Sequence, residues 1–255
     1  MSPYTLQKYT EFTSKRAIWS TYTDANKVIQ ELDEFLAQVN AELPNQALDL
    51  EQEQLFWESS VRMGKFEYIF WTPGDVDLKK IRLELKDQMK RNKAFIDKRK
   101  KAKNTAPLLH MISGDVTGCY ITFSIAAAIF RGYSVKTHYE DAIEGNKDIW
   151  AAHTGLAQWY FYAPGICGGS NKKAGKHFKA AVDCSKTDAD KFYTYIYYSQ
   201  FLFEDKQKDL AADYLNKAEK LYPGNRLTKQ IKELNAKNVS FLQYNREHTG
   251  VDSNN

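Results

Sequence analysis

Proline and glycine are scarce in this chain, with 6 prolines and 13 glycines among 255 residues. These two residues most often interrupt regular structure, so their scarcity favours long, uninterrupted elements. It argues against a β-sandwich or β-barrel, which needs a turn about every 8–12 residues. Apolar residues recur instead at steps of three and four, the period of an amphipathic helix. We therefore predict an all-α chain built of consecutive helical hairpins.

The periodicity predicts helices along most of the chain. Apolar residues from Val28 to Val39 lie on one helical face, and Pro44 ends that helix. Asp49 is expected to cap a helix that runs to Trp71, and the turn 72–75 precedes a third helix that begins near Leu78. Later helices are predicted at 147–163, 171–184, 188–203, 206–221 and 227–242, and the end of the chain, 244–255, is expected to be polar and frayed.

These elements suggest four parts. We expect a divergent helical region at 1–106, a degenerate helical pair at 107–145, two repeats at 146–225, and a capping helix with a polar tail at 226–255. The uncharged run from Val116 to Phe130 is shorter than the roughly 20 residues of a membrane span. It is therefore predicted to be a buried helix, and no membrane span is expected in this chain.

The chain is mildly basic, with a net charge of +4, which does not by itself imply a nucleic-acid partner. Its aromatic content of 14% suits closely stacked helices or a binding groove. The three cysteines form no pattern typical of a disulfide framework or a zinc site.

Two segments of the second half share one spacing of small and large residues. In the later segment the predicted packing residues are Tyr195, Tyr198, Ser199, Leu202, Ala211, Leu215, Ala218 and Pro223. In the earlier segment they are His153, Leu156, Ala157, Tyr160, Ala174, Phe178 and Ala181. The small residues allow paired helices to cross closely, and the large ones fill the space opposite. Such repetition at a fixed period indicates a repeat architecture.

This spacing resembles the tetratricopeptide repeat. The resemblance implies helical hairpins stacked into a right-handed superhelix, with 227–242 as the capping helix that such arrays need. More narrowly, residues 162–181 resemble a variant repeat of exported bacterial tetratricopeptide proteins, including the T component that accompanies some tripartite ATP-independent periplasmic transporters. That resemblance implies a periplasmic accessory of solute transport, partnered by a substrate-binding component, if an upstream signal sequence was removed. If no signal sequence was removed, we expect a cytoplasmic protein. The amino terminus has no apolar signal core, which is compatible with either location.

In this superhelix the second, fifth, ninth and twelfth residues of each unit face the concave side. The residues at these positions are Ala151, Thr154, Gln158 and Phe161 in the first unit, and Tyr193, Ile196, Gln200 and Phe203 in the second. Matched glutamines and phenylalanines would form a polar ladder beside an aromatic one. We expect this groove to bind a protein segment or a small amphiphilic ligand. The alternative is that the tyrosines of the second unit only pack repeats together.

The strongest electrostatic feature is the segment 86–103, which contains nine Lys or Arg and two acidic residues. Its most basic stretch is Lys98, Arg99, Lys100 and Lys101. One interpretation is a surface that binds nucleic acid or an acidic partner. The other, which we favour, is a solvated helix whose basic end suits the helix dipole.

No pattern points to catalysis, so we expect a non-enzymatic protein without a cofactor or a metal. The loop 168–173 lacks the phosphate-binding G-x4-G-K spacing, and Ser170 is expected to cap the next helix instead. The five histidines lie at no zinc-binding spacing: His110, His138, His153, His177 and His248. Acidic pairs such as Glu51/Glu53 and Asp188/Asp190 fall near helix starts, where they complement the dipole.

Overall fold

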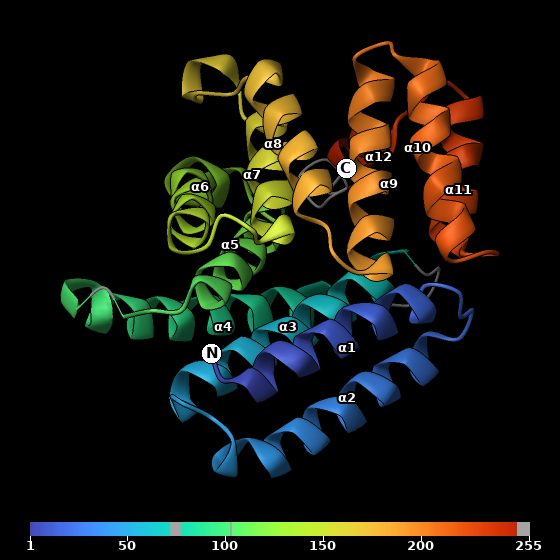
Figure 1. Cartoon of the computed structure of the whole chain (residues 1–255). Coiled ribbons are helices and arrows are strands. Elements are labelled where there is room, and N and C mark those ends of the chain that lie inside the picture. Colours follow the sequence, from blue (N-terminus) through green and yellow to red (C-terminus); the bar gives the residue numbers. More distant parts are fainter. Residues whose placement is uncertain (72–77, 103, 249–255) are drawn as a thin grey trace. The chain divides into compact units, whose positions relative to one another are not determined.

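The computed structural model describes residues 1–71, 78–102 and 104–248, and for residues 68–71, 78, 125 and 248 it describes the backbone alone. Within these ranges the protein is all-helical, with 12 α-helices, three short 3-10 helices and no strand (Figure 1). The prediction of an all-α chain with helices packed in neighbouring pairs is confirmed. The predicted turn at 72–75 and the end of the chain from 249 lie outside the described residues.

The helices of the first half are α1 (Pro3–Trp19), α2 (Ala25–Glu42), η1 (Leu43–Asn45), α3 (Leu50–Trp71), α4 (Leu78–Arg99), η2 (Lys100–Ala102), α5 (Pro107–Ile121) and α6 (Ile125–Gly145). Those of the second half are α7 (Trp150–Tyr162), η3 (Gly165–Cys167), α8 (Asn171–Cys184), α9 (Asp188–Glu204), α10 (Lys208–Leu221), α11 (Arg226–Ala236) and α12 (Phe241–His248). No helix within the described residues is long and apolar enough to cross a membrane.

Short polar side chains set several helix starts, as their sequence positions predict. The Gln52 N–H donates to Asp49 Oδ1 at 3.2 Å at the start of α3. The Lys173 N–H donates to Ser170 Oγ at 3.3 Å at the start of α8, which confirms Ser170 as a cap. Each bond satisfies a backbone donor that the first turn of a helix leaves without a partner.

The expectation of one buried helix over 116–130 is wrong. Helix α5 ends at Ile121 and α6 begins at Ile125, because Ser124 caps a new helix by accepting a bond from the Ala127 N–H at 3.3 Å. Serine and threonine hydroxyls compete with the helical backbone in this way, and the uncharged run contains three such residues. Ile129 and Phe130, at the end of the run, are 75% and 85% exposed.

The predicted capping helix over 227–242 is likewise two helices. Helix α11 ends at Ala236, and Asn238 adopts a left-handed conformation with φ 62°. Asparagine tolerates this conformation better than most residues do. The Val239 N–H then donates back to the Leu234 carbonyl at 3.0 Å, which closes α11 before α12 begins.

The helices form two compact units. Unit 1 comprises Met1–Phe12 and Tyr22–Lys147, and unit 2 comprises Thr13–Thr21 and Asp148–Asn255. Helix α1 therefore contributes its first half to unit 1 and its second half to unit 2. The predicted helical pair at 107–145 lies within unit 1, as does most of the region 1–106.

Unit 1 is built around an aromatic cluster and one buried carboxylate. The rings of Phe12, Phe35 and Trp57 lie with centroids 5.4–5.9 Å apart, and all three side chains are buried. Glu53 on α3 is 0% exposed and accepts hydrogen bonds from the backbone N–H and hydroxyl of Ser2 and from the Thr5 hydroxyl. A fourth bond comes from the Leu48 N–H at 3.1 Å. The carboxylate therefore joins the start of α1 to α3, a tertiary role that its position near a helix start did not indicate.

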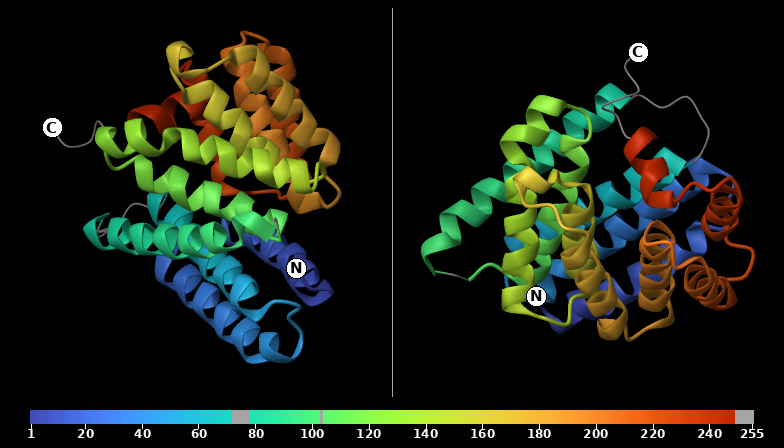
Figure 2. Two further views of the ribbon diagram at one scale, coloured as in Figure 1. Left: turned by 90° about the vertical axis from the view of Figure 1, so that its left-hand side faces the viewer. Right: turned by 90° about the horizontal axis from the view of Figure 1, so that it is seen from above.

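Unit 2 contains the hairpins α7–α8 and α9–α10, which lie side by side and are followed by α11 and α12 (Figure 2). Small residues occupy the helix crossings: Ala157, Ala174, Ser199 and Ala218 are 0% exposed, and Ala181 and Ala211 are 1% exposed. The large residues assigned to packing are also buried, namely His153, Leu156, Tyr160, Phe178, Leu202 and Leu215. Tyr195 and Tyr198 are partly exposed, with their rings against Tyr214, and Pro223 is exposed.

Candidate binding surface on the inner face of α7 and α9

The inner face is defined by seven of the eight residues that the repeat spacing places on the concave side, all except Ala151. Thr154, Tyr193, Ile196 and Gln200 are buried, with exposures of 4%, 8%, 0% and 0%. Gln158, Phe161 and Phe203 are partly exposed. Two of the four buried residues, Gln200 and Tyr193, contact segments of unit 2 outside the two hairpins.

Gln200 contacts the start of α12. Its Oε1 accepts a hydrogen bond from the Phe241 N–H at 2.8 Å, and its Nε2 donates to Ser199 Oγ at 3.1 Å. Both ends of the amide therefore have partners in the interior, as buried polar groups require. The bond is made to the backbone of α12, so it recognises a helix start rather than a particular side chain.

The end of α7 makes a second set of contacts with α12. The Tyr162 hydroxyl donates to the Leu242 carbonyl at 3.1 Å, and burial raises the pKa of Tyr162 well above its usual value. The Arg246 guanidinium lies over two rings, 5.2 Å from the centroid of Phe161 and 5.5 Å from that of Tyr162. Such cation–π contacts favour an arginine over an uncharged residue at this place.

Two apolar side chains carry the packing of α12. Phe241 is 2% exposed and Leu242 is 0% exposed, and the Phe241 ring lies 6.2 Å from that of Tyr197 on α9. Just before the helix, the Ser240 hydroxyl donates to the Glu204 carboxylate at the end of α9 and accepts from the Gln243 N–H at 2.9 Å. Ser240 thus caps α12 and holds it against α9.

The other end of the inner face contacts the second half of α1. The Tyr193 ring stacks on Trp150 with centroids 6.0 Å apart, and the Arg16 guanidinium lies 5.2 Å from the Tyr193 centroid. Asn225 at the start of α11 donates to the Ala17 carbonyl at 3.1 Å. The inner face therefore contacts helical segments of unit 2 at both ends.

Gln158 differs from its counterpart Gln200. It lies on α7 at the equivalent position, is partly exposed, and has no hydrogen-bond partner within the described part of the chain. Phe203, the counterpart of Phe161, lies beneath the ammonium group of Lys208 at 5.3 Å. Of the matched residues, Gln200 and Phe161 contact α12, and Phe203 contacts Lys208. Gln158 is therefore the accessible amide among these four residues.

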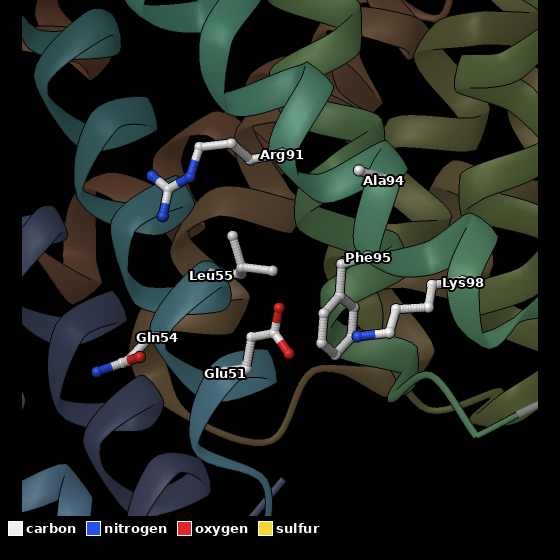
Figure 3. Close-up of a pocket in the computed structure, with 7 residues that line it drawn as sticks. All are labelled: Glu51, Gln54, Leu55, Arg91, Ala94, Phe95 and Lys98. Carbon is white, nitrogen blue, oxygen red and sulfur yellow. The ribbon is translucent and has the colours of Figure 1, made fainter.

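The basic segment in unit 1 is partly engaged by other side chains. Arg99 pairs with Asp49 and lies over the Phe95 ring at 4.1 Å, whereas Lys98, Lys100 and Lys101 are exposed. A cavity of about 320 Å³ between α3 and α4 is lined by Glu51, Gln54, Leu55, Arg91, Ala94, Phe95 and Lys98 (Figure 3). The cavity lining carries the cations Arg91 and Lys98 together with the carboxylate of Glu51, so the charge of the cavity is mixed rather than uniformly positive.

The four histidines whose side chains the structure describes occupy packed positions. The Nδ1 atoms of His153 and His177 lie 3.1 Å apart between α7 and α8, and the His177 ring stacks on Tyr160. His110 and His138 lie together between α5 and α6. Within the described ranges, no three His, Cys, Asp or Glu side chains gather at a geometry that could hold a metal ion.

No protein-family model matches this chain, and the search of curated proteins finds no match either.

Proposed function

We propose that the protein is a non-enzymatic binding scaffold that recognises a protein segment on the inner face of α7 and α9. The observation that supports this most directly is that the face already contacts helical segments of its own chain at both ends. Gln200 and Tyr162 bond to the backbone of α12, and Phe161 meets its arginine. Stacked helical hairpins characteristically bind their ligands on such a face.

The choice of a protein segment over a small amphiphile follows from the chemistry of these contacts. Hydrogen bonds to a backbone N–H and a backbone carbonyl, set beside aromatic rings, fit a polypeptide. The nucleic-acid alternative has less support, because Arg99 is paired and the adjoining cavity carries a carboxylate. The tetratricopeptide architecture, the transport role and the periplasmic location stay predictions from sequence resemblance.

A site-specific crosslink tests the proposal. A photoreactive amino acid replaces Gln158 on the inner face in the full chain, expressed in its own organism, and a control replaces Lys176, which is exposed on α8. We expect position 158 to capture one defined polypeptide and position 176 not to capture it. Equal capture at both positions, or no adduct at 158, would refute the proposed surface.

A further inference from the structure

Helix α12 is too short to be stable by its own backbone bonds. It spans 8 residues, whereas isolated helices shorter than about 12–15 residues are marginal in water. Its helical form therefore depends on the surface that receives it. That surface consists of inner-face residues and their neighbours on α7 and α9, so the structure records how this face binds a short helix.

The contacts with α12 show which features of a helix the inner face can recognise. Gln200 accepts the first N–H of the helix, a donor that every helix start leaves without an internal partner. The apolar pair Phe241 and Leu242 follows a serine cap and is buried. Arg246 lies five residues after Phe241, where it meets the rings of Phe161 and Tyr162. The matching ligand is a short helix with a Ser-type cap, an aromatic–aliphatic pair in its first turn, and an arginine one and a half turns later.

We infer that the partner of the inner face is a helical protein segment of this chemistry, and that it competes with α12 for the same place. This inference rests on the proposed function and names the class of its ligand. The link between α11 and α12 is the short stretch 237–240, which turns through the left-handed Asn238. Two buried apolar side chains and a few polar bonds hold α12, so a partner that supplies the same groups can replace it.

The test uses a fluorescent, acetylated peptide of residues 239–247 and the full chain. In the unaltered protein α12 competes at an effective concentration on the order of millimolar, so the peptide is expected to bind weakly. The double variant Phe241→Ala/Arg246→Ala changes α12 but leaves the inner face intact, and we expect it to bind the peptide at least ten-fold more tightly. The matched control Gln243→Ala/Glu247→Ala alters two exposed residues of the same helix and should bind the peptide as weakly as the unaltered protein.

Equal peptide affinity for the double variant and the unaltered protein, with unchanged helical circular dichroism, would overturn the inference. So would tight binding of a peptide that carries the same two alanines. If the double variant loses its helical signal, hydrogen exchange of the unaltered protein tests instead whether α12 can leave the inner face. We expect the amides of α12 to exchange at least ten-fold faster than those of α9, and equal protection would show α12 to be a fixed part of the core. A partner crosslinked at position 158 together with a failed peptide test refutes the ligand class and leaves the scaffold function standing.

Discussion

Acidification should destabilise unit 1 through His138. Its ring lies on α6, 5.9 Å from that of His110 on α5, and the Nδ1 atoms of both are buried without a hydrogen bond. Burial, together with the nearby His110 and Lys93, lowers the pKa of His138 from 6.5 to about 4, against the opposing charge of Asp97. Burial also lowers the pKa of His110, whose positive form Asp141 would favour.

The sign and size of the effect follow from proton linkage. The folded state holds His138 neutral, so between the two pKa values the unfolded chain binds more protons and stability falls as the pH falls. The contribution is fully present above a pH of about 6.5 and is lost progressively down to about 4. With these values, about 2–3 kcal/mol of the free energy of unfolding is lost between roughly pH 7.5 and pH 4.5.

The variant His138→Leu removes this titration and keeps an apolar group between α5 and α6. Urea unfolding of both proteins, followed by far-ultraviolet circular dichroism at the two pH values, measures the effect. We expect the unaltered protein to lose about 2–3 kcal/mol more than the variant on acidification, because the variant lacks the His138 titration. A difference below about 0.5 kcal/mol would refute the depressed pKa of His138.

Four further substitutions, one of which is a control, test the packing of unit 1 by urea unfolding. A Cβ on Gly114 would lie 2.7 Å from the Tyr139 ring, so Gly114→Ala should lower the free energy of unfolding by about 1–3 kcal/mol. The control is Gly132→Ala, whose Cβ meets open space and which should be neutral or stabilising. Equal effects of the two substitutions would contradict the close approach at Gly114. Glu53→Gln should cost about 2–3 kcal/mol at neutral pH, because a carboxylate with four donors is replaced. Burial alone would raise the Glu53 pKa, but those four bonds hold it below 4.5. The stability lost in Glu53→Gln should therefore shrink as the pH falls below 4.5, and a loss that is constant with pH would argue against the lowered pKa. Phe130→Ser, at an 85% exposed side chain, should change stability by less than about 0.5 kcal/mol, and a larger loss would show that α6 packs more closely than described.

The sequence alone predicted the local structure well, for reasons confined to each helix. Periodicity and caps depend on neighbours a few residues apart, so the starts at Asp49 and Ser170 and the helix over 171–184 were predicted correctly. The predicted packing positions of the two hairpins fall on buried small and large residues, with Tyr195, Tyr198 and Pro223 more exposed. This pattern depends only on spacing within one repeat.

Breaks inside apolar runs were harder to predict. Ser124 and Asn238 each divide a stretch that reads as one helix, because a single side-chain bond or a left-handed residue outweighs a continuous apolar pattern. Hydropathy also predicted that Phe130 is buried, but burial depends on whether another element covers that face. In this structure the side chain remains largely exposed.

Contacts between distant segments could be seen only in the tertiary structure. Gln158 and Gln200 occupy equivalent places in two similar repeats, yet one is accessible and the other bonds to α12, 41 residues further along the chain. Glu53 looked like an ordinary acid at a helix start, but it is bonded to Ser2 and Thr5, which precede it by 51 and 48 residues in the sequence. Local spacing places such residues on a helix face, and only the packing of remote segments decides which of them meet a partner.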